Sequence, residues 1–189
     1  MRNFARVSSL SPFGLSLMLL QVSACSKGDD AAKAADSAAL AASVAAPPAS
    51  LYDRLGGKTA ITAVVDSFVA RVAADTRING KFARSNIPRV KTMLVDQICA
   101  QSGGPCTYTG RSMKEAHANM GVTDGEFGAL VEDLIATMAA FNIPQMEQDD
   151  LLTALGAMRT DIVAVKSPET GTRLPASFKA APPLDSTKK

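Results

Sequence analysis

The spacing of apolar residues constrains the fold of this chain more than any other feature of its sequence. Apolar side chains occupy positions 61, 64, 65, 68 and 72, and spacings of three and four recur within 90–98, 127–138 and 151–165. This period places the apolar residues on one face of an α-helix. Because no segment shows the sustained apolar–polar alternation of a half-buried strand, the sequence predicts an all-α fold.

Residues that favour helix ends bracket these four stretches. Thr123, followed three positions later by Glu126, matches a capping box at the start of the third helix. Pro88 suits the first turn of the second helix, and the Gly-Gly-Pro run at 103–105 ends that helix. Pro144 marks the end of the third helix. The pattern therefore predicts four separate helices.

Composition divides the chain into four parts. Residues 1–24 are typical of a secretory signal peptide, and 25–50 are an Ala-rich tether without an apolar stripe. The folded domain is expected over 51–166, and 167–189, rich in Pro, Ser, Thr and Lys, is expected to be a disordered tail. The formal net charge of only +2 lacks the basic surplus of a nucleic-acid-binding protein.

The amino-terminal segment predicts export and a lipid anchor. Arg2 and Arg6 precede an apolar stretch that Pro12 and several serines interrupt, which favours a signal peptide over a membrane span. The stretch ends in Val-Ser-Ala-Cys, similar to bacterial lipoprotein signals, in which the Cys is lipidated. Lipidated Cys25 would then anchor the chain, and the expected location is the periplasm, at the outer membrane. Ordinary cleavage after Ala24 is the other interpretation.

The chain contains one histidine, His117, on a segment too short to be stable alone. Glycines and a proline crowd the residues around it, so at most 112–119 forms a short helix, with Met113 and His117 on the same face. Such a helix needs a surface on which to dock. A large flat apolar ligand is one such surface, and the neighbouring helices are the other.

Five stretches together resemble the group I truncated haemoglobins: LYDRLGGKTAI, DSFVARV, the phenylalanine in GKFARSNIPRVK, GGPCTYTGRSMKEAH and DGEFGALV. Their order and spacing agree with that family from Leu51 to about Val163. The resemblance implies a two-over-two α-helical sandwich around haem b.

The same resemblance implies roles for individual residues. His117 falls on the family's proximal iron ligand, and its second ring nitrogen needs an acceptor, for which we expect a backbone carbonyl in the preceding turn. Phe82 matches the phenylalanine that stacks on haem, whereas Phe68, Tyr108 and Phe127 match core positions near it. Three basic residues are either partners of the haem propionates or ordinary surface charges: Arg89, Lys91 and Arg111.

The opposite, distal side departs from the family pattern. The family usually has Phe-Tyr in the first long helix, and that hydroxyl donates to the oxygen ligand; this chain has Phe68-Val69. Val90 and Leu94 occupy positions that are often polar in the family. The distal wall is therefore expected to be apolar, to hold oxygen loosely, and to favour carbon monoxide and nitric oxide, which depend less on a donor.

Three sulfur-containing residues allow further interpretations. Met93 is either a core residue or a sixth iron ligand, and His/Met ligation suits electron transfer. Cys99 and Cys106 remain once Cys25 is lipidated, and an even number of cysteines in an exported protein favours a disulfide over two separate buried thiols.

The sequence thus predicts a haem protein that binds oxygen, nitric oxide or carbon monoxide. An enzyme, either a nitric oxide dioxygenase or a peroxidase, is the alternative, and it would need an external reductase because no reductase domain is present. A His/Met-ligated redox lipoprotein is a third possibility.

Overall fold

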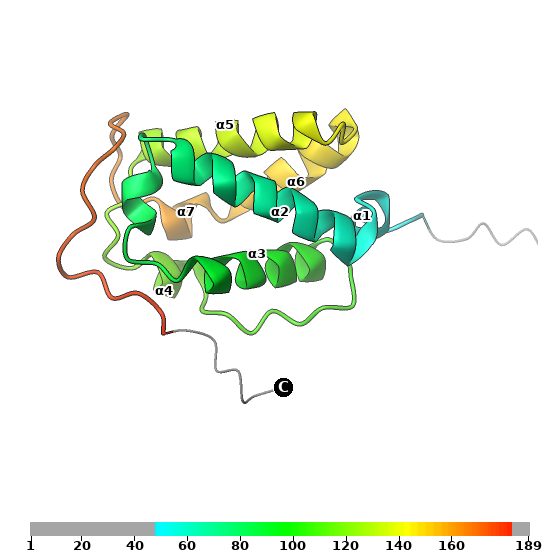
Figure 1. Cartoon of the computed structure of the whole chain (residues 1–189), viewed down its shortest axis with the longest axis horizontal. Coiled ribbons are helices and arrows are strands. Elements are labelled where there is room, and N and C mark those ends of the chain that lie inside the picture. The colour runs from blue at the N-terminus through cyan, green and yellow to red at the C-terminus, as the bar shows by residue number, and fades with distance from the viewer. Residues whose placement is uncertain (1–47, 183–189) are drawn as a thin grey trace, which may run out of the picture. The chain divides into compact units, whose positions relative to one another are not determined.

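The computed structural model describes residues 48–182, and all regular secondary structure in this range is helical, apart from one isolated bridge between Thr123 and Val165 (Figure 1). The predicted signal peptide, Cys25 and nearly all of the tether lie outside the described residues. The elements are α1 (Leu51–Arg54), α2 (Gly57–Ala74), the 3-10 helix η1 (Asn79–Phe82), α3 (Ile87–Gln101), α4 (Met113–His117), α5 (Asp124–Ala140), α6 (Gln145–Ala157) and α7 (Arg159–Ile162). The prediction of an all-α fold is confirmed.

Helix α2 is the centre of the domain and packs on both α3 and α5 (Figure 1). The predicted stripe from Ile61 to Val72 is buried, and Val69 widens it, with 7% of its surface exposed. The main hydrophobic cluster, here called the helical cluster, combines this face with buried residues of α3, α5 and α6, including Val95, Met138 and Leu151. Each long helix therefore has an apolar face in one shared core.

The predicted helix starts are confirmed by their capping bonds. The Thr123 hydroxyl accepts from the Glu126 backbone N–H, and the Glu126 carboxylate accepts from the Thr123 N–H. Helix α3 begins at Ile87, with Pro88 in its first turn and the Asn86 side chain as its cap. Because each cap satisfies backbone N–H groups that the helix leaves unpaired, these helices begin at defined residues.

The turn between α1 and α2 requires glycine. Gly56 and Gly57 have φ values of 86° and 74°, in the left-handed region that glycine adopts without steric cost. The domain begins one residue earlier than predicted, because Ser50, which we assigned to the tether, caps α1 by accepting from the Asp53 N–H.

The last predicted helix is interrupted. The apolar spacing over 151–165 predicted one helix, but α6 ends at Ala157, and α7 covers only Arg159–Ile162. Val165 lies beyond α7, with 45% of its surface exposed, and forms the bridge with Thr123. Its backbone pairs with the start of α5, so the chain leaves the helical path after Ile162.

The prediction of a disordered tail from residue 167 is wrong for residues 167–182, which we call the strap. The Gly125 N–H donates to the Ser167 carbonyl at 3.0 Å, and Phe178 is 5% exposed. Figure 1 shows the strap passing the side of the domain where α4 and the α2–α3 connection lie. The sequence of the strap shows no helical period, because backbone hydrogen bonds and the buried Phe178 ring hold this segment, rather than a repeated apolar face.

None of the helices between residues 48 and 182 is long and apolar enough to cross a membrane.

Candidate functional site

A cavity of about 220 Å³ opens between α2, η1, α3, α4 and the strap. Its lining is mostly apolar and includes nine residues that the sequence predicted for the site: Phe68, Val69, Phe82, Val90, Met93, Leu94, Tyr108, Met113 and His117. The structure thus brings together side chains from α2, α3, α4 and the two intervening connections. Phe127, which the resemblance matched to a core position near haem, does not line this cavity itself but packs in a second hydrophobic cluster with Met120 and Phe178, both of which line it.

The His117 imidazole is held by a hydrogen bond that leaves one of its ring nitrogens free. Its Nδ1 lies 2.8 Å from the Met113 carbonyl oxygen, the predicted acceptor in the preceding turn. A donated Nδ1–H leaves the Nε2 lone pair as the one available to a metal. Burial lowers the pKa of the His117 imidazole, and this outweighs the opposing effect of the Met113 bond. The neutral ring, the form that binds iron, is therefore favoured at neutral pH.

Helix α4 holds this imidazole although it has only five residues. Ser112 and Glu115 form a capping box at its start, with the Ser112 hydroxyl accepting from the Glu115 N–H at 3.3 Å. In the loop before it, the Tyr108 hydroxyl donates to the Arg111 carbonyl at 2.7 Å. A Cβ on Gly110 would overlap the Tyr108 ring, so this turn is closed tightly around glycine.

A second cavity of about 130 Å³ lies between α2, α3, α5 and α6 and shares Phe68, Leu94 and His117 with the first. Its walls are almost entirely aliphatic. The two spaces therefore adjoin at the imidazole.

Sequence reasoning missed one polar side chain in both cavities, Gln97. It is 8% exposed, and its amide nitrogen lies 3.5 Å from the Met113 sulfur and 3.2 Å from the Met158 sulfur. Thioethers are weak acceptors, so this amide remains a strong donor inside an apolar space. Its position three residues after Leu94 was the available signal, because i and i+3 share a helix face.

The basic candidates separate into two groups. Arg89 and Arg111 line the first cavity, where a guanidinium can pair with a carboxylate. Lys91 instead forms an ion pair with Asp66 at 2.8 Å on the helix surface. The ordinary surface interpretation is therefore correct for Lys91 among the described contacts.

Cys99 and Cys106 lie together at the end of α3. Their sulfur atoms are at bonding distance, and their Cα atoms are 5.7 Å apart, within the range that a disulfide spans. This pair joins α3 to the loop that leads to His117. A Cβ at Gly104 would lie 2.8 Å from both the Cys99 carbonyl oxygen and its sulfur, so glycine is needed for this close return of the chain.

Comparison with known proteins decides the family. Residues 50–164 match the family model described as bacterial-like globin. A group 1 truncated haemoglobin of Mycolicibacterium paratuberculosis is 37% identical over 117 residues, which cover 62% of this chain and 86% of that protein. The chain belongs to the group 1 truncated haemoglobins. The corresponding protein of Synechocystis is 35% identical over 112 residues, 57% of this chain and 87% of its own.

Solved structures confirm the two-over-two architecture of this truncated haemoglobin. The Fe(III) form of a truncated haemoglobin from Tetrahymena pyriformis is 28% identical, with a TM-score of 0.59 over 61% of this chain and 98% of the other. The 2/2 haemoglobin of Synechococcus sp. PCC 7002, in the cyanomet state and with covalently attached haem, is 34% identical, with a TM-score of 0.58 and the same coverage.

The cofactor of this truncated haemoglobin is haem b, and the residues of the site fit it. The cavity offers a partly buried imidazole with one free nitrogen, aliphatic walls, the Phe82 ring and two guanidinium groups. The imidazole suits the iron, the aliphatic walls and the Phe82 ring suit the flat apolar macrocycle, and the two guanidinium groups suit its two carboxylates.

Proposed function

We propose that this truncated haemoglobin binds diatomic gases reversibly at a haem whose iron has His117 as its only protein ligand. The observation that carries the proposal is the hydrogen bond between His117 Nδ1 and the Met113 carbonyl at 2.8 Å. This bond fixes the tautomer in which the Nε2 lone pair is available to bind iron. When bound, haem supplies the iron at which the gas is held. The protein supplies the neutral imidazole and the apolar walls.

The proposed specificity follows from the distal wall, which is formed by Val69, Val90 and Leu94. None of these can donate a hydrogen bond to oxygen. A charge-assisted donor contributes about 1.5–3 kcal/mol, so its absence corresponds to a roughly 10- to 100-fold weaker hold on oxygen. Carbon monoxide and nitric oxide depend less on such a donor. The Gln97 amide is a donor in the same cavity, and its bonds go to two sulfurs.

Absorption spectra and oxygen dissociation rates test both parts of the proposal. The haem-loaded protein is expected to show a Soret band that His117→Ala abolishes or shifts.

Val69→Tyr places a hydroxyl on the distal wall and is expected to slow oxygen dissociation by about 10- to 100-fold, whereas Val69→Phe, the matched control, lacks the hydroxyl. A wild-type rate as slow as that of Val69→Tyr would contradict the apolar-wall argument. Gln97→Leu then shows whether the amide is the donor responsible.

A His/Met-ligated redox protein is the second candidate, because Met93 and His117 line the same cavity. A thioether on iron would raise the reduction potential and produce a charge-transfer band near the red edge of the visible spectrum in the ferric protein. An unchanged ferric spectrum in Met93→Leu would eliminate this candidate.

Export as a lipoprotein completes the proposal. Cys25 follows the small residues of a lipoprotein signal, and a Cys99–Cys106 disulfide suits an oxidising compartment. Cys25→Ser is expected to move the protein from the membrane to the soluble fraction of the periplasm. Alkylation of the unreduced, denatured protein is expected to label neither Cys99 nor Cys106. Labelling of both would contradict the disulfide.

A further inference from the structure

The outer wall of the first cavity is built by a segment outside the family match. Phe178, Ala180 and Ala181 line this cavity, whereas the match to the bacterial-like globin model ends at residue 164. Phe178 is 5% exposed and belongs to the second hydrophobic cluster, with Met120, Val122, Phe127 and Ile162. The strap therefore adds a wall to the site that the matched domain does not contain.

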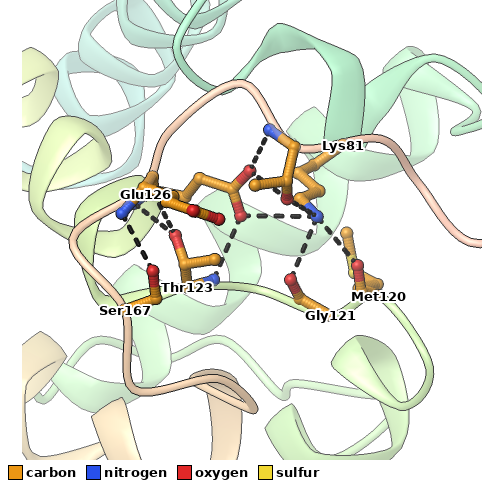
Figure 2. A network of polar contacts seen from close by, with 8 residues as sticks. Lys81, Met120, Gly121, Thr123, Glu126 and Ser167 are labelled. Atoms are coloured by element: carbon orange, nitrogen blue, oxygen red, sulfur yellow. Dashed lines mark hydrogen bonds and ion pairs between the residues drawn. The ribbon is translucent and has the colours of Figure 1, made fainter.

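A buried ion pair fixes the strap in place (Figure 2). The Lys81 and Glu126 side chains are 4% and 1% exposed, and Nζ lies 3.3 Å from Oε2. Glu126 Oε1 accepts from both the backbone N–H and the hydroxyl of Thr172, at 2.8 and 2.7 Å. The Thr172 hydroxyl in turn accepts from Lys81 Nζ at 2.7 Å. Thr172 thus satisfies bonding capacity on both charged groups.

The same ion pair connects the strap both to η1, which carries Phe82, and to the segment that follows His117. Lys81 precedes Phe82 in η1, and its Nζ also donates to the carbonyls of Met120 and Gly121, at 3.0 and 3.1 Å (Figure 2). These carbonyls follow His117 closely in the chain. Because a buried charge that loses its partners is costly, the strap, η1 and the segment after α4 are held as one unit.

A second contact holds Phe178 from the solvent side. Arg84 donates to the carbonyls of Pro175 and Ala176, and its guanidinium lies 5.7 Å from the centre of the Phe178 ring. This distance suits a cation–π contact. Arg84 is two residues after Phe82, so the strap is attached to the same connection that carries the ring expected to stack on haem.

We propose that the strap is a retaining wall of the haem site, in which Phe178 contacts the edge of the porphyrin and slows the release of haem. The proposal rests on the proposed function, because it requires that His117 hold haem in this cavity. Haem would leave past Phe178, Ala180 and Ala181, so its release requires the strap to open. The wall also sets how far the rim of the cavity is exposed to water.

The experiment measures haem dissociation from the haem-loaded protein to an excess of haem-free myoglobin, followed by the change in the Soret band. Phe178→Ala is expected to accelerate dissociation by about 10- to 100-fold, the range that corresponds to losing one buried aromatic contact. Thr172→Val keeps the shape of the side chain and the backbone N–H bond to Glu126, but removes the hydroxyl bonds to Lys81 and Glu126, and it is expected to accelerate dissociation by a smaller factor. Phe141→Ala is the matched control, because this phenylalanine is 43% exposed and outside the cavity, and it is expected to leave the rate unchanged.

Arg84→Gln provides a variant that leaves the cluster intact, because Arg84 is exposed. It is expected to accelerate haem release while the circular dichroism spectrum and the unfolding midpoint of the haem-free protein stay close to wild type. Rates unchanged in both Phe178→Ala and Arg84→Gln would overturn the retaining wall and leave the proposed function standing. A wild-type protein that takes up no haem, or a His117→Ala variant with an unaltered Soret band, would instead overturn the proposed function and the wall with it.

Discussion

The two hydrophobic clusters of the domain are held together in different ways. The helical cluster joins long helices, and its buried and partly buried members recur every three or four residues along α2 and α5, with Leu94, Val95 and Ile98 added from α3. The second, here called the strap cluster, joins Phe178 of the strap to residues beside α4, α5 and α7, and polar contacts surround it. The difference teaches that a segment without periodicity can be fixed by a few buried polar bonds, provided that each charged group is fully partnered.

The largest expected effect comes from breaking the ion pair beside the strap cluster. Lys81→Met leaves the Glu126 carboxylate buried without its cation, and the free energy of unfolding is expected to fall by about 3–5 kcal/mol. Urea denaturation followed by circular dichroism measures it. The double variant Lys81→Met/Glu126→Leu is expected to recover part of the loss, because no charge remains buried. A single variant within about 0.5 kcal/mol of wild type would mean that apolar packing alone holds this cluster.

A smaller effect is expected from a cavity in the helical cluster. Met138 in α5 has 0% of its surface exposed, and Met138→Ala is expected to reduce the free energy of unfolding by about 2–4 kcal/mol through lost packing. Met146→Ala is the matched control, since Met146 is 61% exposed, and should change it by less than about 0.5 kcal/mol. Equal effects of the two substitutions would contradict the assignment of the core.

Two capping boxes show what a contact with the strap adds to a helix cap. The Thr123 hydroxyl caps α5 and also donates to the Glu169 carbonyl of the strap at 2.5 Å. Thr123→Val is expected to cost about 1–2 kcal/mol, and Ser112→Ala, which removes only the cap of α4, about 0.5–1 kcal/mol. Thermal unfolding of both variants measures the difference. A Ser112→Ala effect as large as that of Thr123→Val would show that the strap contact adds nothing.

The smallest effect concerns pH and a carboxylate beside the helical cluster. Burial raises the pKa of Asp133 above its usual 3.8, with Asp75 adding to the shift, and its Oδ2 has no partner among the described residues. The folded state therefore binds this proton more tightly than the unfolded state, so stability falls as pH rises through this range. Asp133→Asn is expected to melt at a higher temperature than wild type at pH 7, and this advantage should vanish below pH 3.8. A variant that melts below wild type at pH 7 would show that the carboxylate is stabilising.

Much of the helical cluster could be predicted from the sequence, and so could the residues of the candidate site. The apolar positions of α2, the capping box at Thr123 and the short helix around His117 depend on contacts within a few residues, which leave a local pattern. The gathering of Phe82, Leu94 and His117 in one cavity was implied by the resemblance to a known family rather than by spacing.

The strap was the main failure of prediction. Its Pro, Ser, Thr and Lys content is typical of disorder, and one phenylalanine among these residues carries no period. Gln97 was missed for a related reason, because a glutamine on a helix is usually exposed, whereas this one lies between two methionine sulfurs.

The sequence by itself determined the all-α class, the start of α5, the family and the histidine that faces the cofactor site, because each depends on local spacing or on motifs in a fixed order. Only the tertiary structure decided that Lys81 and Glu126 meet across 45 residues of chain and that Thr172 completes their bonding. Such contacts form between segments whose separation in sequence carries no period. Their partners become evident only when the chain is folded.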